Sequence, residues 1–213
     1  WKKEEKSVKE EHSKQGYNGR FGPGLPQISD GQLLFMLNGI KKLKEGHGRM
    51  AIIQNGSSLF NGDAGSGPSE IRKYIIENDL LEAIIQLPND LFYNTGISTY
   101  IWVISKDKEC KRVDKVQLID ASKCYVKRRK NIGSKRVDLT DDCIKLILKA
   151  YNEFNNNEYI ENDLQVYSKV YDKEFFGYTK ITVETAVVDA NGQLIFKKGK
   201  LQPIKGETDN EII

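Results

Sequence analysis

The chain has 213 residues, of which 38% are hydrophobic and 30% are charged, so it is long enough and apolar enough to bury a core. Its formal net charge of +3 is too small to identify a nucleic-acid-binding protein by itself. It contains no apolar run of about 18 residues, and its N-terminal stretch is charged, which argues against a membrane helix and a secretory signal. We therefore expect a cytoplasmic protein.

The cysteines and histidines predict neither a disulfide framework nor a metal site. Cys110, Cys124 and Cys143 are odd in number and form no C-x-x-C pair, so we expect three reduced thiols. His12 and His47 are too far apart in the sequence to suggest one ligand cluster. We expect no metal and no catalytic histidine.

The first 28 residues offer little for a core. Residues 1–15 are almost all polar, and residues 16–27 are rich in Gly and Pro, so residues 1–28 are predicted to be a mobile or loop segment. The first helix is then predicted over Asp30–Lys44, where apolar residues recur at helical intervals, and Ser29 and Gln32 have the spacing of a capping box.

Four short apolar runs predict strands at residues 50–54, 81–87, 99–104 and 115–119. A helix beginning near Pro68 separates the first two, so they are predicted to form a βαβ unit, paired in parallel with a right-handed crossover. The third strand follows the second too closely for a helical crossover and is expected to return antiparallel.

Residues 121–137 contain no acid and seven cationic side chains, and are interpreted as a basic linker. An amphipathic helix is predicted over residues 141–154, with Thr140 as its N-cap. Residues 180–188 and 194–197 are predicted to be extended, joined in a hairpin at Asn191 and Gly192.

Several short sequence segments, in a fixed order along the chain, resemble segments of one protein family. They are GRMAIIQNGSSLF at residues 48–60, IR at 71–72, LPNDLFYNTGI at 87–97, IWV at 101–103, IDAS at 119–122 and FGYTKITVE at 176–184, and residues 20–21 and 29–35 are similar to the family as well. Together they resemble the modification subunit of type I restriction-modification systems, an adenine-N6 DNA methyltransferase. The resemblance is weakest at residues 1–15 and after 185.

The resemblance implies an α/β fold: part of a Rossmann-like, S-adenosylmethionine-dependent methyltransferase sheet, its last strands with an antiparallel hairpin, followed by a C-terminal helix and β-hairpin extension. Residues 29–122 would be the C-terminal half of the methyltransferase domain, and residues 123–213 a basic linker, helix and extension. Trp1 in place of Met, and the unfinished stretch at the C-terminal end, predict a segment of a longer protein.

Two motifs of the family do not occur in this sequence: the Gly-containing turn that binds S-adenosylmethionine and the Asn-Pro-Pro-aromatic catalytic motif. We therefore expect no catalytic and no cofactor-binding residue here, and an isolated chain that neither transfers methyl groups nor binds S-adenosylmethionine. Because part of the sheet would be missing, we also expect an exposed strand edge that invites homodimerisation.

By its position in the LPNDLFYNTGI word, Phe92 matches the family's aromatic residue that stacks on a flipped adenine, and Tyr93 is the second choice. A core aromatic that closes the hairpin is the other interpretation of Phe92. Asn55 and Ser57, after the first strand, and Asn94 and Thr95, in the later turn, would line the same substrate pocket, although turn formation alone explains both groups equally well.

The basic residues have two open roles. Lys127, Arg128, Arg129 and Lys130 are candidates for contacts with the DNA backbone, but subunit contact or solubility explains them as well. The resemblance implies three partners: DNA, a specificity subunit and a restriction subunit. The alternative function is a non-catalytic assembly module that docks the specificity subunit through residues from about Asp141 onward.

Overall fold

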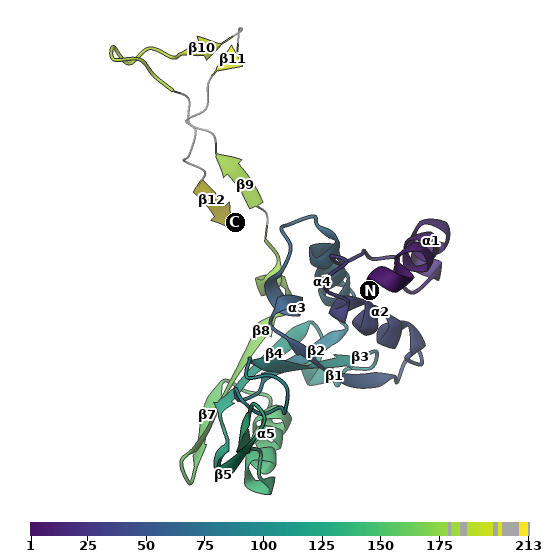
Figure 1. Ribbon diagram of the computed structural model, residues 1–213, viewed down its shortest axis with the longest axis vertical. Helices are drawn as coiled ribbons and strands as arrows, with labels where there is room; N and C mark the ends of the chain where they lie inside the picture. The colour runs from purple at the N-terminus through teal and green to yellow at the C-terminus, as the bar shows by residue number, and fades with distance from the viewer. Residues whose placement is uncertain (179, 184–186, 198–199, 202–208, 213) are drawn as a thin grey trace. The chain divides into compact units, whose positions relative to one another are not determined.

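The computed structural model describes residues 1–178, 180–183, 187–197, 200–201 and 209–212 (Figure 1). It contains two compact units, Trp1–Phe176 and Gly177–Ile213. Within the described residues, no helix is long and apolar enough to cross a membrane.

A six-stranded sheet forms the centre of the first unit, with the strand order β1-β3-β2-β4-β8-β7. Only β2 and β4 pair in parallel, and every other neighbouring pair is antiparallel. The strands are β1 (Arg49–Asn55), β2 (Leu81–Gln86), β3 (Thr99–Ser105), β4 (Lys115–Lys123), β7 (Asn157–Glu161) and β8 (Leu164–Asp172). The mixed α/β class predicted from the sequence is confirmed, although the sheet is mostly antiparallel.

The predicted direct pairing of the first two strands is wrong, because β3 lies between β1 and β2 and is antiparallel to both. The connection from β2 to β3 is short, so β3 folds back into the place that a parallel β1 would have taken. β1 then pairs with the remaining edge of β3. The antiparallel return of the third strand is confirmed, and β1 and β2 still run in the same direction.

Two helices, α2 (Gln32–Lys42) and α4 (Gly67–Glu77), pack against one face of the sheet. Leu37 and Ile40 of α2 and Ile71 and Ile75 of α4 share a core with Trp102 of β3. Each such side chain contributes about 1.5–3 kcal/mol by leaving water. Pro68 lies in the first turn of α4, as predicted. The N-cap prediction for α2 is wrong: Gly31 is the N-cap, and Asp30 Oδ1 accepts from the Gln32 amide at 3.0 Å.

The predicted N-terminal loop is largely helical, with η1 (Lys2–Glu4), α1 (Glu5–Gln15) and η2 (Gly16–Asn18). Val8 and Phe21 are buried in the same core as α2. Charged pairs also hold the segment together: Glu11 with Arg20 at 2.5 Å, and two pairs four residues apart along α1. Sequence reasoning missed this helix because it depends on one buried valine and on charge pairing instead of an apolar stripe.

The opposite face of the sheet is covered by α5 (Asp141–Glu153), which packs Leu146, Ile147 and Ala150 against β4 and β8. Thr140 caps this helix by accepting from the Cys143 amide at 3.4 Å, as predicted. Cys143 and Cys124 are buried in the same cluster, and burial raises the pKa of the Cys124 thiol to about 12. These two cysteines therefore behave as core residues.

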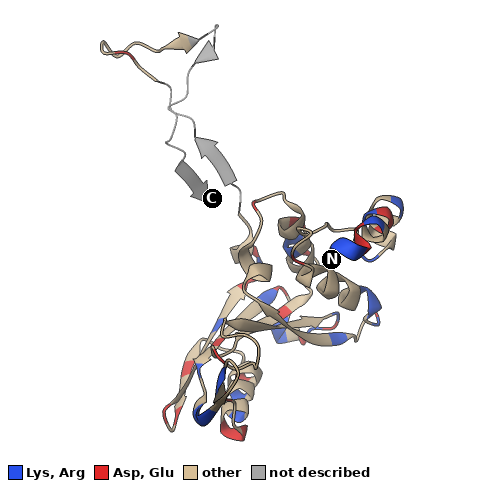
Figure 2. Ribbon diagram, viewed as in Figure 1, with Lys and Arg blue, Asp and Glu red and all other residues tan. Residues whose placement is uncertain are grey.

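The predicted basic linker is instead a two-stranded ribbon, β5 (Val126–Ile132) paired with β6 (Lys135–Asp138). Gly133, with φ +58°, occupies the turn, and Val137 is buried against Leu87 and Leu91. Lysine and arginine colour much of this ribbon in Figure 2. Sequence reasoning missed this ribbon because its signals, one buried valine and one turn glycine, are hidden among many charged residues.

The remaining short elements of the first unit are α3 (Ser57–Phe60), η3 (Cys110–Arg112) and η4 (Lys173–Phe176). In the second unit, the predicted hairpin at Asn191 and Gly192 is confirmed by a bridge between Val188 and Leu194. There β9 (Lys180–Val183) pairs with β12 (Asp209–Ile212), and β10 (Phe196–Lys197) with β11 (Lys200–Leu201). Residues 184–186 of the predicted extended stretch lie outside the described residues.

The boundary between the two units falls between Phe176 and Gly177 in the sequence, so residues 123–176 belong to the same unit as residues 29–122. Assignment of these segments to functional domains stays a prediction.

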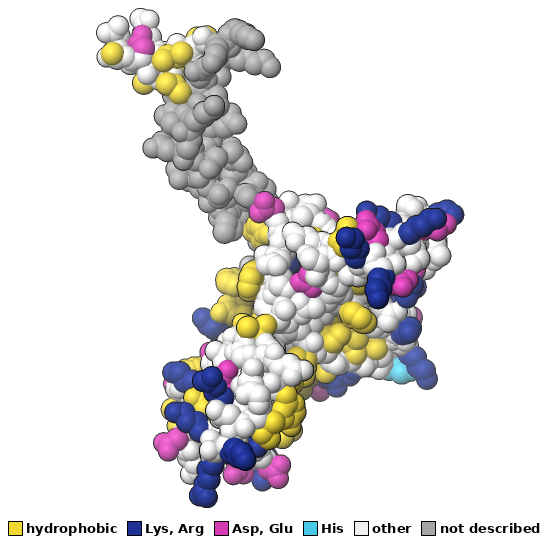
Figure 3. All heavy atoms as spheres, viewed as in Figure 1, with side chains coloured by type: hydrophobic (Ala, Val, Ile, Leu, Met, Phe, Trp, Pro, Cys, Tyr) yellow, Lys and Arg dark blue, Asp and Glu magenta, His cyan; other side chains and the backbone are white. Residues whose placement is uncertain are grey.

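β1 and β7 are the outer strands of the sheet. Hydrophobic side chains reach the surface near α2 and β1 (Figure 3), and Phe35 and Ile53 are exposed. Homodimerisation through an exposed strand edge stays a prediction, which light scattering of the chain at several concentrations would check.

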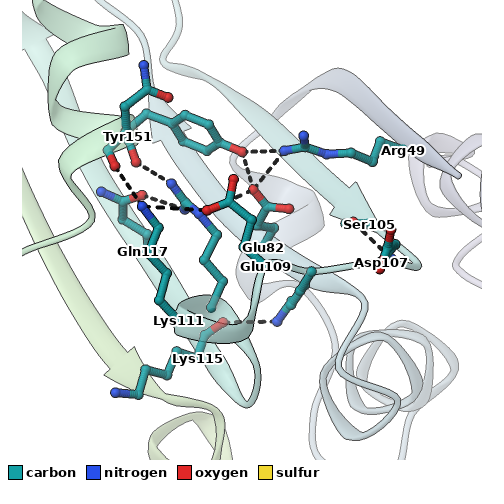
Figure 4. A network of polar contacts seen from close by, with 12 residues as sticks. Arg49, Glu82, Ser105, Asp107, Glu109, Lys111, Lys115, Gln117 and Tyr151 are labelled. Atoms are coloured by element: carbon teal, nitrogen blue, oxygen red, sulfur yellow. Dashed lines mark hydrogen bonds and ion pairs between the residues drawn. The ribbon is translucent and has the colours of Figure 1, made fainter. Parts of the chain in front are cut away.

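A buried polar network joins the beginning of β2 to α5 (Figure 4). Glu82, only 2% exposed, accepts from Arg49 at 2.8 Å and from the Tyr151 hydroxyl. Arg112, also 2% exposed, lies 3.7 Å from Glu82 and 4.3 Å from the Tyr151 and Phe154 ring centroids. Burial, and then the bond to Glu82, raises the pKa of Tyr151 to about 12. Arg49, Arg112 and the Tyr151 hydroxyl therefore all stabilise the negative charge of the buried Glu82 carboxylate.

We predict that Arg112→Met lowers the free energy of unfolding by about 3–5 kcal/mol, because it leaves the buried Glu82 carboxylate short of its buried partner. The double variant Arg112→Met with Glu82→Leu should be less destabilised than Arg112→Met alone, since no buried charge remains there. Urea titrations of the wild type, of both single variants, Arg112→Met and Glu82→Leu, and of the double variant measure this. A double variant that loses the full sum of the single effects would contradict the ion-pair interpretation.

Candidate functional site

The carboxyl ends of three strands meet at one edge of the sheet. Asn55 ends β1 opposite Thr99, and Gln86 ends β2 between Tyr100 of β3 and Asp120 of β4. In open α/β sheets, ligands bind outside the carboxyl ends of the strands. The two groups of residues predicted to line a pocket both follow strands that end here, one after β1 and one after β2.

A compact polar network occupies the β1 side of this edge. Gln32 Nε2 donates to Asn55 Oδ1 and to Ser57 Oγ, both at 2.8 Å, and Gln32 Oε1 accepts from the Asn55 amide at 2.7 Å. Ser57 Oγ donates to Asp30 Oδ2. Burial alone would raise the pKa of Asp30, but hydrogen bonds from Ser57 and Gln32 outweigh it, and the pKa is lowered from its ordinary value. The site thus holds a carboxylate that stays ionised.

Asn55 and Ser57 are therefore brought together at the edge, and they also form the turn after β1. Asn55 Oδ1 accepts from the Ser57 amide at 2.9 Å, which is turn chemistry of the kind the sequence allowed. Their role in a substrate pocket stays a prediction. Gln32 and Asp30, which hold them in place, carry no sequence signal of this role, because their position beside β1 comes from the packing of α2.

Two buried polar atoms beside the network lack partners. Gln54 Oε1 and Thr99 Oγ1 have no hydrogen-bond partner among the residues that the structure describes. Such atoms are uncommon in folded proteins, where nearly all buried polar groups are paired with protein or water.

The second predicted group lies in the turn between β2 and β3. Phe92 and Thr95 form an isolated bridge, and Asp90 adopts φ +57° with its amide directed at the Gly96 carbonyl. Phe92 is half-buried against the cluster of Leu87, Leu91 and Val137, so both interpretations of this residue remain open. Tyr93 is 57% exposed.

The β5–β6 ribbon lies against this turn, which sequence reasoning did not foresee. The Ser134 amide donates to the Tyr93 carbonyl at 2.9 Å, and the Arg136 amide to the Asp90 carbonyl at 2.8 Å. Lys135 Nζ donates to the Leu91 carbonyl at 3.1 Å and lies 5.5 Å from the centroid of the Tyr93 ring. These contacts join residues about 40 positions apart in the sequence, so no local sequence pattern predicts them.

A cavity of about 410 Å³ lies on the sheet face covered by α4. Its lining is mostly apolar, with Gln86 and Asp120 at the carboxyl edge, and Trp102 Nε1 in its wall has no hydrogen-bond partner among the described residues. No run of the sequence indicated it. The remaining lining residues include Leu59, Ile76, Ile84, Leu118 and Phe176. Within the described part of the chain, no group of three His, Cys, Asp or Glu residues is arranged to hold a metal ion.

Comparison with known proteins gives the family. The sequence model of the N-6 DNA methylases matches residues 1–199. The chain belongs to this family. A type I restriction enzyme methylase subunit of Methanocaldococcus jannaschii is 38% identical over 107 residues, which cover 48% of this chain and 18% of the relative. A methylase subunit of the same kind from Mycoplasma pneumoniae is 37% identical over 75 residues, 34% of this chain and 13% of the relative.

The solved structures agree with these relatives. The methyltransferase subunit of a type I restriction-modification system from Streptococcus thermophilus superposes with a TM-score of 0.59 at 30% identity, covering 73% of this chain and 30% of that one. The resemblance to type I modification subunits indicated by the sequence is thus confirmed. The matched stretches span about a fifth or less of the two methylase subunits, so this N-6 DNA methylase chain corresponds to part of them.

We predict that Asp30→Asn lowers the free energy of unfolding near neutral pH, because the carboxylate accepts bonds from Ser57 and Gln32. A carboxyl group with a lowered pKa stabilises the fold above its ordinary pKa, and loses that contribution as pH falls through the lowered value. The gap between wild type and Asp30→Asn should therefore narrow from about pH 7 to about pH 3.

Urea midpoints measured across that range check this prediction. Asp163→Asn is a suitable control, because Asp163 is exposed and its backbone conformation, φ +67°, is one that Asn accepts. A gap that stays constant, or a control that shows the same pH dependence, would count against the network.

Proposed function

We propose that the whole protein containing this chain methylates N6 of adenine in DNA, as the modification subunit of a type I restriction-modification system. The observation that carries the proposal is the family match over residues 1–199, together with the placement of Asn55, Ser57 and the 92–95 turn at the carboxyl edge of the sheet. We expect the protein to act in the cytoplasm with DNA, a specificity subunit and a restriction subunit as partners.

The reaction needs precise placement because the lone pair of the adenine amino group is delocalised into the ring. S-adenosylmethionine, when bound to the whole protein, supplies a methyl group on a sulfonium centre. Holding two reactants in line can contribute roughly 7–11 kcal/mol to such a step. The described part of the chain would serve the other half of the task, by receiving the base.

The residues at this edge do not fit the cofactor. Gly56 follows β1, but a Cβ there would lie 3.2 Å from the Phe60 ring, so the turn is filled by a side chain and offers no open cradle. The Asp30 carboxylate is already engaged by Ser57 and Gln32. We therefore assign no cofactor-binding or catalytic residue among the described residues of this edge.

We propose instead that the 92–95 turn forms one side of an adenine pocket. A base must leave the duplex before its amino group can react, and planar side chains that stack on it compensate the lost stacking. Phe92 matches the family position, and Tyr93 offers the more exposed ring. Asn55 and Ser57 would line the floor, and Asn94 and Thr95 a wall.

We predict that replacing the stacking residue by Ala weakens binding of target DNA by about 5- to 150-fold, since a stacked base is worth about 1–3 kcal/mol. Phe92→Ala and Tyr93→Ala should be compared in the full-length protein by DNA titration, with Tyr17→Ala, a ring 68% exposed, as the control. Affinity for S-adenosylmethionine should stay unchanged.

Thermal unfolding of the same variants separates the two interpretations of Phe92. If Phe92→Ala unfolds, or loses DNA and cofactor binding equally, Phe92 is a core residue of the hairpin. If neither variant weakens DNA binding, the turn does not receive the base.

We also predict that the 213-residue chain by itself neither binds S-adenosylmethionine nor transfers methyl groups. Calorimetric titration with the cofactor and a methyl-transfer assay on duplex DNA measure this. A clear titration would show that a cofactor site exists within these residues.

A second candidate function is assembly. Residues 177–213 form a compact unit of their own, and Tyr178 near its beginning is exposed. Such a unit suits docking of a specificity subunit. Pull-down of that subunit with and without residues 177–213 tests this; a deletion from residue 140 is less suitable, because it removes β8, which pairs with β4.

A further inference from the structure

The ribbon β5–β6 and the turn between β2 and β3 make one continuous surface. Backbone amides of Ser134 and Arg136 bond to carbonyls of Tyr93 and Asp90, so the two segments are joined by main-chain contacts that do not depend on side-chain identity. At Gly133 a Cβ would lie only 2.6 Å from the Tyr93 carbonyl oxygen, which shows how closely the tip of the ribbon approaches the turn. Whatever binds the ribbon is therefore held beside Tyr93.

The charges on the ribbon divide into two groups. Asp138 is its one acid, and it is paired with Arg128 at 2.5 Å and with Lys135 at 3.0 Å. Lys135 also bonds to the Leu91 carbonyl, so these two cations have internal structural roles. The remaining four make no ion pair within the described residues and are exposed: Lys127, Arg129, Lys130 and Arg136.

This separation changes the set of candidate cations. Arg128 was a candidate by sequence, but its guanidinium is engaged by Asp138 and by the Lys130 carbonyl. Arg136 was not a candidate, yet its side chain is exposed while its amide is fixed to the turn. Lysine and arginine side chains gather at the end of the unit that carries β5 (Figure 3).

We propose that the β5–β6 ribbon binds the phosphate backbone of DNA next to the extruded base, through Lys127, Arg129, Lys130 and Arg136. The inference rests on the proposed function and deepens it, because it assigns the backbone contact to a segment physically attached to the pocket turn. Phosphate contacts fix the register of a protein on the duplex without reading sequence. A ribbon bonded to residues 90–93 would thereby set the distance between the held backbone and the pocket.

An acidic protein surface would match the same four charges. DNA is favoured because the ribbon is bonded to the turn in which we place one side of the adenine pocket, and because no acidic residue lies between its unpaired cations in the sequence. The two occupants differ in salt dependence: each phosphate neutralised contributes about 0.9 to the slope of log affinity against log salt.

The test uses the full-length protein and duplex DNA, with binding measured by fluorescence anisotropy at several salt concentrations. Two double variants remove the free charges, Arg129→Gln with Lys130→Gln, and Lys127→Gln with Arg136→Gln. The matched control is Lys42→Gln with Lys44→Gln, two exposed lysines before the amino end of β1. Each ribbon variant should reduce the salt slope by about 2 and weaken target and non-target duplexes alike, while the control changes neither.

Three outcomes would overturn the inference: an unchanged slope in both ribbon variants, an equal reduction in the control, or an unchanged slope accompanied by loss of a co-purifying acidic subunit. A methyl-transfer assay of the wild-type protein on the same duplex separates this inference from the proposed function. A protein that methylates adenine but whose ribbon variants keep the full slope contradicts the ribbon alone. A protein that transfers no methyl group to adenine, yet shows the reduced slopes, contradicts the proposed reaction alone.

Discussion

The hydrogen-bond ladders on both sides of β3 are the constraint on which the arrangement depends. Because β3 pairs antiparallel with β1 and with β2, those two strands run in the same direction and end at the same edge. The parallel pairing of β2 with β4 adds Asp120 to that edge. A slip of β3 by one residue would turn Trp102 away from the core that α2 and α4 cover, so burial and strand register enforce one another.

The two ends of β1 and β2 differ in how their polar groups are paired. At the beginning of β2, Glu82 and Arg112 are buried with Tyr151 and attach the C-terminal part of α5 to the sheet. At the carboxyl edge, Gln54 and Thr99 retain unpaired polar atoms within the described residues, and Tyr93 is exposed. The buried ion pair therefore lies toward the amino ends of β1 and β2, whereas the substrate residues that we propose lie at the carboxyl ends.

The function proposed for this edge depends on the family relationship. The N-6 DNA methylase match covers most of the chain, whereas the curated relatives are several times longer than the stretches matched. We propose that the described residues serve one part of the reaction, the reception of a base and of the backbone beside it. The ribbon that carries Lys127, Arg129, Lys130 and Arg136 is bonded to the turn that follows β2 through its Ser134 and Arg136 amides, so the two proposed contacts would lie on joined segments.

The sequence by itself determined the elements whose signals are local. Pro68 in the first turn of α4, Thr140 at the cap of α5, the apolar strands and the hairpin at Asn191 and Gly192 were all predicted, since each depends on residues a few positions apart. The ordered sequence words likewise indicate the family on their own, because a family resemblance lies in the order of the residues along the chain.

Only the tertiary structure decided what depends on distant partners. The insertion of β3 between β1 and β2, the helix α1 held by Val8 and Arg20, and the docking of the basic ribbon on the Asp90–Tyr93 carbonyls join segments that no periodicity relates. Their physical reason is competition for burial and for hydrogen-bond partners. The partner of a strand edge, of a buried valine or of a free carbonyl depends on which segments the whole fold packs beside it.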